Sequence, residues 1–148
     1  PGFGFADDNC YLLTPEMYEF FAYPILKRIF DYWSPNPGDR RYQHSDSDMK
    51  HLLPVLAKLN LTGCNFGPTV LVEDIRKYMP NTRIDGCISP LTFMRNDEEA
   101  IIAEVKRDCE MAKGTRGLNL TTAGSINNGT LLTSMRAVMY AIQTYGRY

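Results

Sequence analysis

The fold is most clearly indicated by residues 82–112, which read TRIDGCISPLTFMRNDEEAIIAEVKRDCEMA. Residues 82–88 predict a short β-strand. After a longer connection, residues 97–112 predict an amphipathic helix. Asn96 is the expected N-cap of that helix, with Glu99 three residues later as its capping-box partner. The stretch therefore predicts one strand followed by one helix.

The same alternation of strand and helix occurs five times along the chain. The predicted strands cover 3–6, 41–44, 61–66, 82–88 and 117–121, and the predicted helices cover 15–33, 48–59, 70–78, 97–112 and 131–144. Thr14 and Pro15 mark the start of the first helix, and Pro54 is expected to kink the second. This alternation is typical of βαβ crossovers and a parallel sheet. No linker divides residues 1–148, so we expect a single α/β domain.

Five βα units fit either a small doubly wound sheet or part of a (β/α)8 TIM-type barrel. A whole barrel needs about 250 residues, so a chain of 148 residues can supply only a portion of one. Two features favour the barrel. No glycine-rich phosphate loop follows any strand, and polar residues follow nearly every strand, where barrel enzymes place their chemistry. Because the chain opens in the middle of this pattern, we expect a fragment or a processed product.

The composition argues against several classes of protein function. Lys and Arg number 16 against 17 Asp and Glu, a formal net charge of −1, which argues against nucleic-acid binding. No apolar run approaches the roughly 18–20 residues of a membrane span. The four cysteines are widely spaced, without any CxxC pair. We therefore expect reduced thiols and a cytoplasmic protein.

Polar side chains gather at the expected carboxyl ends of the strands. Asp7 and Asp8 follow the first strand, His44 and Asp46 end the second, and the later strands contribute Asn65, Ser89, Thr122 and Ser125. Carboxylates with an imidazole suit zinc or another divalent metal such as Mn²⁺, or a general acid/base pair. We take His44, Asp46 and Asp8 as candidate catalytic residues, with His44 and Asp46 as metal ligands. Candidate substrate-binding residues are Asp7, Asn65, Phe66, Ser89, Thr122 and Ser125.

A purely structural interpretation stands beside this one. Asp and Ser after a strand are also ordinary helix caps and turn residues. Phe66 could flank a ligand or belong to the core, and Cys64, Cys87 and Cys109 are expected to be buried small apolar residues. The combination of His44, Asp46 and the Asp7-Asp8 pair favours a functional site.

In order and spacing, five segments resemble the C-terminal half of the uroporphyrinogen-decarboxylase superfamily, which includes corrinoid-dependent methyltransferases. The segments are 14–18, 44–46, 85–90, 96–105 and 122–145. The likeness spans essentially the whole chain. It implies that the chain supplies about the last five units of a (β/α)8 barrel and that an N-terminal half is missing.

The chain departs from the family pattern where its chemistry is known. Asp8 stands where the decarboxylase has a serine, and Gly124 stands where it has a histidine. The zinc methyltransferases use His-x-Cys and a later Cys, whereas His44-Ser45-Asp46 has Asp in place of the first Cys, and the later Cys falls on Gly124. The thiolate zinc site of these relatives is therefore not expected. The residues present leave open a harder, oxygen-rich site of His44 and Asp46, completed by Asp7 or Asp8.

These residues lead to three hypotheses. The first is a methyltransferase that moves a methyl group from a small methoxy or methylamine donor to a corrinoid on a partner protein. The second is a decarboxylase of a porphyrinogen-like polycarboxylate, for which Arg95 is the only rim arginine to propose. The third is a non-catalytic half-barrel that self-associates or binds a partner through unpaired sheet edges.

Overall fold

The computed structural model describes residues 1–147, which form a sheet of five parallel strands. The strands are β1 (Gly2–Ala6), β2 (Arg40–His44), β3 (Gly63–Asn65), β4 (Arg83–Ile88) and β5 (Leu118–Thr122). Each lies within two residues of its predicted bounds at either end. Their order in the sheet is β1-β2-β3-β4-β5, so every strand pairs with its neighbour in the sequence. This confirms the α/β class and the parallel sheet.

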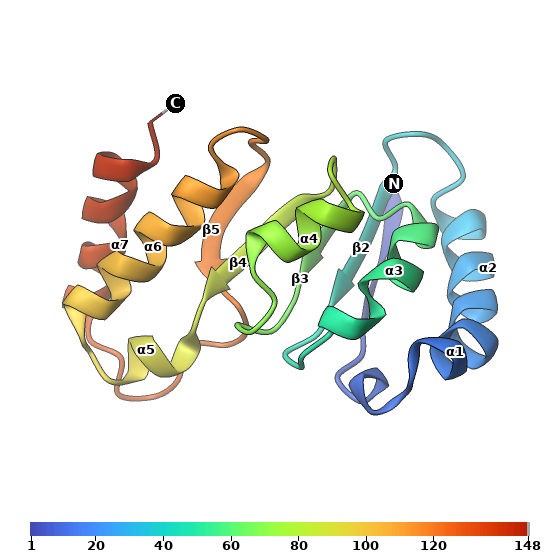
Figure 1. Cartoon of the computed structure of the whole chain (residues 1–148), viewed down its shortest axis with the longest axis horizontal. Coiled ribbons are helices and arrows are strands. Elements are labelled where there is room, and N and C mark those ends of the chain that lie inside the picture. Colours follow the sequence, from blue (N-terminus) through green and yellow to red (C-terminus); the bar gives the residue numbers. More distant parts are fainter. Residues whose placement is uncertain (148) are drawn as a thin grey trace.

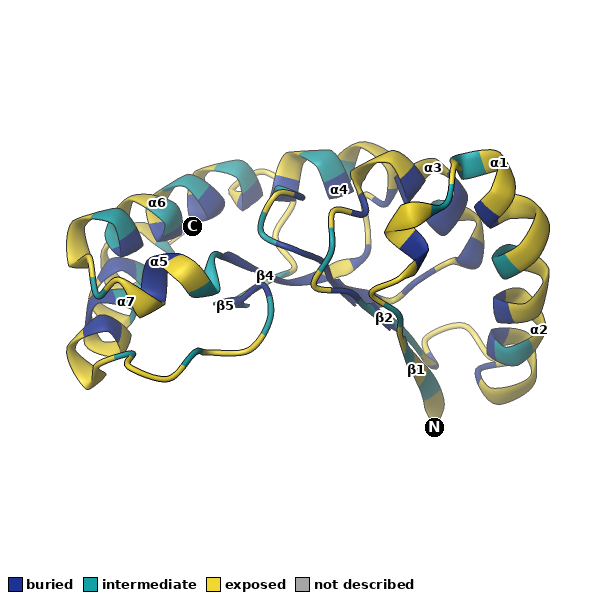
Figure 2. Cartoon of the chain, turned by 90° about the horizontal axis from the view of Figure 1, so that it is seen from below, coloured by how far each residue is buried: buried dark blue, intermediate teal, exposed yellow. Residues whose placement is uncertain are grey.

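The sequential strand order decides between the two architectures. A doubly wound sheet reverses its strand order at a switch point, and this sheet has no reversal. Right-handed crossovers without a reversal place the helices on one side of the sheet. Figure 2 shows α3, α4 and α6 along one side, with α2 and α7 near its two ends. The arrangement is part of a (β/α)8 barrel.

The principal helices follow the strands in turn (Figure 1). They are α1 (Pro15–Met17), α2 (Tyr23–Trp33), α3 (Leu53–Leu56), α4 (Val72–Tyr78), α5 (Pro90–Met94), α6 (Glu98–Ala112) and α7 (Leu132–Tyr145). Thr14 caps α1 as predicted, its Oγ1 accepting from the N–H of Met17 at 3.2 Å. A π-helical turn, η2 (Tyr18–Ala22), joins α1 to α2. The helix predicted over 48–59 is three short pieces, with Pro54 at the start of α3.

The predicted cap of α6 is wrong by one residue. Asp97 is the N-cap, and its Oδ1 accepts from the N–H of Ala100 at 3.0 Å. Asn96 has a φ of 54°, outside the extended region that an N-cap adopts. Its side chain instead reaches α7: Oδ1 accepts from the N–H of Leu131 at 2.7 Å and from Oγ of Ser134 at 2.9 Å. The connection before α6 also contains α5, for which the Ser89-Pro90 pair is the sequence signal.

Two apolar clusters between sheet and helices form the core. The larger one joins β1–β4 with η2, α2, α3 and α4, and the smaller one joins the end of β4 with α5, α6 and α7. Cys64, Cys87 and Cys109 are buried and free, as is Cys10. The first helical region buries Tyr18, Leu26 and Phe30, whereas Phe20 is 74% exposed and Ile25 61% exposed. The outer apolar face of this region is therefore not part of the core of this chain.

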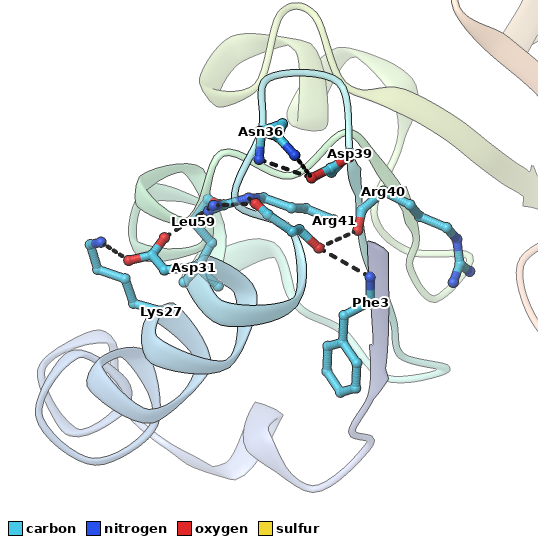
Figure 3. Close-up of polar contacts among 9 residues, drawn as sticks. Phe3, Lys27, Asp31, Asn36, Asp39, Arg40, Arg41 and Leu59 are labelled. Carbon is cyan, nitrogen blue, oxygen red and sulfur yellow. Dashed lines mark hydrogen bonds and ion pairs between the residues drawn. The ribbon is translucent and has the colours of Figure 1, made fainter. Parts of the chain in front are cut away.

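At the amino ends of the strands, polar contacts join α2 to β2 (Figure 3). The Arg41 guanidinium donates to the carbonyls of Ser34 and Leu59 and to Oδ1 of Asp31, at 2.9–3.2 Å. Contacts at this end of a barrel serve stability rather than chemistry. The opposite, carboxyl ends of the strands are where barrel enzymes place their chemistry. Among residues 1–147, no helix is both long and apolar enough to cross a membrane.

Candidate metal centre

The carboxyl ends of β1 and β2 bring three predicted residues together. Ala6 lies opposite His44 in the parallel register, so the segments after these residues leave the sheet side by side. Asp8, His44 and Asp46 each offer one ligand atom, and the three atoms lie within 4.8 Å of one another. These are the three residues predicted from the sequence as catalytic, and in the structure they form one cluster.

Hydrogen bonds between the two strand ends shape this cluster. Oδ1 of Asp8 accepts from the N–H of Asp46 at 2.7 Å, and the carbonyl of Asp8 accepts from Oγ of Ser47 at 2.8 Å. Nε2 of His44 lies 3.2 Å from Oδ1 of Asp46. The side chains of His44 and Asp46 are 32% and 49% exposed, so solvent ions can reach them.

The remaining nitrogen of His44 faces inward. Nδ1 lies 2.8 Å from Oδ1 of Asn65, which ends β3. The Asn65 amide nitrogen donates to the backbone carbonyls of Asp85 and Thr122, the latter at 3.2 Å. Asn65 is 6% exposed and is held by β4 and β5 as well as by its own strand. The imidazole is thus fixed from inside the barrel and open toward the two carboxylates.

A shallow hollow of about 400 Å³ continues from His44 over the inner face of the sheet. Among the predicted residues, Asn65, Thr122 and Ser125 line it with His44. Its lining also includes residues that the sequence analysis did not name as site residues: Tyr42, Asp85, Asn119, Thr121 and Gly124. Tyr42 and His44, like Asn119 and Thr121, are two apart on one strand, so the two-residue period of a strand is the signal that finds them.

Acidic and amide groups give this hollow its polar character. Asp85 pairs with Arg83 at 3.0 Å and accepts from the Asn119 amide at 3.2 Å. Burial, and secondarily the nearby Asp85 carboxylate, raise the pKa of Tyr42 to about 12. Tyr42 therefore stays a neutral phenol over the physiological pH range.

The other predicted site residues lie apart from the cluster or serve the backbone. Oδ1 of Asp7 accepts from the N–H groups of Asn9 and Cys10, which makes Asp7 a turn cap. Phe66 is 1% exposed and packs in the larger core cluster. Ser89 precedes α5, and its N–H donates to Glu104 at 2.7 Å. The structure does not bring these three side chains to the Asp8–His44–Asp46 cluster.

Gly124 explains how Asp46 fits beside the last loop. Its φ is 120°, a conformation that favours glycine, and a Cβ placed there would lie 2.8 Å from Oδ1 of Asp46. Any side chain at position 124 would therefore push against the carboxylate of Asp46. The absence of a side chain at Gly124 leaves room for Asp46 in its observed position.

The donor set fits a divalent cation. When Nδ1 of His44 carries the proton, Nε2 and the Asp46 oxygen 3.2 Å away are both acceptors. A cation placed between these two acceptors would be attracted by both. One imidazole nitrogen and two carboxylate oxygens are ligands that Zn²⁺ and Mn²⁺ accept. Asp8, His44 and Asp46 are the residues that would hold such an ion.

Together these features define a partial βα barrel with a candidate metal centre at the carboxyl ends of its strands. A family model described as uroporphyrinogen decarboxylase (URO-D) matches residues 3–145. The chain belongs to this family. The prediction of the superfamily from the order of short motifs is therefore confirmed.

Among solved structures, the chain is similar to a methyltransferase from Methanosarcina mazei. The TM-score is 0.77 at 19% sequence identity, and the match covers 97% of this chain and 42% of the methyltransferase. This likeness supports the fold, and the chain spans well under half the length of that protein. No curated protein matches the sequence.

Proposed function

We propose that this chain is part of a methyltransferase that moves a methyl group from a small methoxy or methylamine donor to a corrinoid on a separate protein. The observation that carries the proposal is the Asp8–His44–Asp46 cluster at the carboxyl ends of β1 and β2. Family membership and the fold shared with a methyltransferase support it. The cytoplasm is the proposed location, because the four cysteines are free thiols.

In this proposal, the donor lies in the hollow over the inner face of the sheet, next to His44. His44, Asp46 and Asp8 would hold a divalent metal such as zinc, which when bound would supply Lewis acidity to the leaving group. The hydrogen bond from Asp46 N–H keeps Asp8 oriented. The oxygen or nitrogen that loses the methyl group would keep the bonding electron pair and take up a proton from solvent, which reaches the exposed side chains of this cluster.

The charges at this rim favour methyl transfer over decarboxylation of a polycarboxylate. A polycarboxylate substrate needs cationic partners, whereas the cluster presents Asp8 and Asp46. Arg83, which reaches Asp85 beside the hollow, is already paired with that carboxylate at 3.0 Å. The second hypothesis therefore has less support from the described residues than the first.

The metal content of the purified chain tests the proposal. After dialysis against Zn²⁺ and Mn²⁺, we expect near-stoichiometric metal in the wild type by inductively coupled plasma mass spectrometry. Loss of an outer-shell partner of a metal ligand typically lowers metal affinity about 10–100-fold. Because His44→Ala removes a ligand itself, we expect a larger loss of metal affinity. His51→Ala is the matched control, because His51 contacts the Leu13 carbonyl and lies outside the cluster. A metal-free wild type, or full retention by His44→Ala, would overturn the proposal.

A pair of glycine variants probes Asp46 without changing a ligand. Gly124→Ala should weaken metal binding by about 10-fold, because the new Cβ displaces the carboxylate of Asp46. Gly129→Ala is the control: Gly129 also has a positive φ, of 90°, but no atom lies within 4 Å of its Cβ position. Equal metal affinity in the two variants would show that Asp46 does not contribute to the site.

A further inference from the structure

We infer that Asn65 is a positioning residue that holds His44 in the tautomer with hydrogen on Nδ1 and the lone pair on Nε2. The contact that points to this role is the 2.8 Å distance between Nδ1 of His44 and Oδ1 of Asn65. The use of this tautomer in catalysis rests on the proposed function. The tautomer itself is a property of the chain without metal.

The neighbours of Asn65 fix the orientation of its side-chain amide. Its two neighbours toward β4 and β5 are the backbone carbonyls of Asp85 and Thr122. Carbonyl oxygens only accept hydrogen bonds, so the NH₂ group of Asn65 must face them. A flipped amide would place its oxygen against two carbonyl oxygens in a buried position. Oδ1 of Asn65 therefore faces His44.

The tautomer of His44 follows from that orientation. Oδ1 of Asn65 is an acceptor, so Nδ1 of His44 must carry the hydrogen to form the bond. The alternative tautomer would place two acceptors 2.8 Å apart beside a side chain that is only 6% exposed. On the outer side, Asp46 is 49% exposed, so water can solvate its carboxylate when Nε2 carries no hydrogen. The buried contact therefore sets the tautomer.

In this tautomer, the lone pair on Nε2 of His44 faces the carboxylate of Asp46. Nε2 is the nitrogen that lies 3.2 Å from Asp46, and metal ions bind the unprotonated nitrogen of a neutral imidazole. Asn65 thus acts through His44, which gives this buried amide a role other than the substrate contact predicted from sequence.

Side-chain ¹⁵N NMR tests the inference directly, because the chain has two histidines. Nε2 of His51 lies 2.9 Å from the Leu13 carbonyl, so His51 must carry its hydrogen on Nε2. In mildly alkaline buffer we expect opposite tautomers: hydrogen on Nδ1 in His44 and on Nε2 in His51. The spectrum of His51→Gln assigns the signals. Hydrogen on Nε2 of His44 in the metal-free wild type would overturn the inference.

Two variants distinguish a positioning role of Asn65 from a merely structural one. Asn65→Ala should convert His44 to a mixture of tautomers. Asn119→Ala removes another amide that lines the same hollow but leaves the His44 contact in place, so the Nδ1–H form should persist. A single unchanged tautomer in folded Asn65→Ala would contradict the inference. If that variant does not fold, the wild-type spectrum still decides.

Zinc addition separates this inference from the proposed function. We expect the Nε2 signal of His44 to shift with Zn²⁺ while Nδ1 keeps its hydrogen and His51 does not change. An Nδ1–H tautomer whose signals do not respond to Zn²⁺ would support the role of Asn65 and overturn the metal site. A zinc complex formed through Nδ1 would overturn the role of Asn65 and keep the metal site.

Discussion

At the scale of single residues, Asp108 in α6 is a buried carboxylate whose charge carries an energetic cost. It is fully buried, its Oδ2 accepts from the N–H of Cys87 at 3.1 Å, and its Oδ1 lies 2.7 Å from the Arg107 guanidinium. Burial raises the pKa of Asp108 above its usual value, because desolvation outweighs the attraction of Arg107. Relative to the unfolded chain, the folded chain therefore binds a proton on Asp108 more tightly.

This shift predicts a pH dependence of stability. At a pH between the pKa values that Asp108 has in the unfolded and in the folded chain, the folded chain binds more protons than the unfolded chain. The stabilisation that is present at lower pH is therefore lost as the pH rises through the folded pKa. The loss is at most about 1.4 kcal/mol per pH unit. Asp108→Asn should remove this slope from urea unfolding curves measured upward from about pH 4. Glu110→Gln, an exposed change on the same helix, should keep it; identical slopes in wild type and Asp108→Asn would contradict the prediction.

One rule is enough to predict from the sequence that Asp8, His44 and Asp46 lie close together. Residues after neighbouring parallel strands emerge at the same edge of a sheet, and recognising the strands is enough to place them. The rule does not say which way a side chain turns within the loop. Asp7 turns back to cap its own backbone, although it is adjacent to Asp8. The burial of Phe66 likewise depends on packing that the strand pattern does not encode.

At the scale of helices, Asn96 fastens the start of α7 to the loop before α6. Besides its contacts with Leu131 and Ser134, its amide nitrogen donates to the carbonyl of Gly129 at 2.9 Å. Asn96→Gly removes these bonds and tolerates the φ of 54°. Because Ser134 is fully buried, we expect the free energy of unfolding to fall by about 1–3 kcal/mol.

Chemical denaturation measures this effect, with Asn128→Gly in the exposed loop before α7 as the control. Asn128→Gly should leave the unfolding midpoint nearly unchanged. Equal midpoints for wild type and Asn96→Gly would mean that the Asn96 bonds do not stabilise α7.

Helix boundaries show where local sequence signals reach their limit. The capping rule located the start of α6 within one residue, and Thr14 was assigned correctly because a proline follows it. Asn96 and Asp97 are both good caps, and the choice between them depends on α7, more than thirty residues away. Local sequence signals also did not predict α5, because its five residues are too few to show the helical period of hydrophobic positions.

At the scale of the whole molecule, the sheet is open at both sides. Among the described residues, β1 pairs only with β2, and β5 pairs only with β4. Large apolar side chains are exposed near both edges: Phe20 and Ile25 in η2 and α2, and Leu132 and Met139 in α7. Exposed edges and apolar faces favour association.

We therefore expect the 148-residue chain, studied alone, to self-associate with a second copy as its concentration increases. Sedimentation velocity over a concentration series measures this. The double variant Phe20→Ser and Ile25→Ser should shift the distribution toward monomer, because it removes exposed apolar area at one edge. The double variant Glu98→Ser and Arg136→Ser, at exposed polar positions of α6 and α7, is the control. A wild type that stays monomeric at every concentration would contradict the prediction.

The barrel architecture could be predicted from sequence because it depends on a repeated pattern and not on any single contact. Five strand–helix units indicated a parallel sheet, and the polar strand ends favoured a barrel over a doubly wound sheet. The strand order itself, which confirmed the choice, is a property of tertiary structure.

That strand order also bears on how the chain can acquire its structure. Since each strand pairs only with strands directly before or after it in the sequence, each pairing closes a single crossover, and the paired residues lie from 20 to 38 positions apart, as for Gly63 with Arg83 and Gly2 with Arg40. Each crossover must lose its loop entropy before the next strand can pair, which makes a parallel sheet slower to form than a hairpin. During synthesis, each unit that leaves the ribosome can add its hydrogen bonds to the edge left by the unit before it. Among the described strands, the β1–β2 pair, with the residues of the candidate metal centre, then forms before the three later pairs.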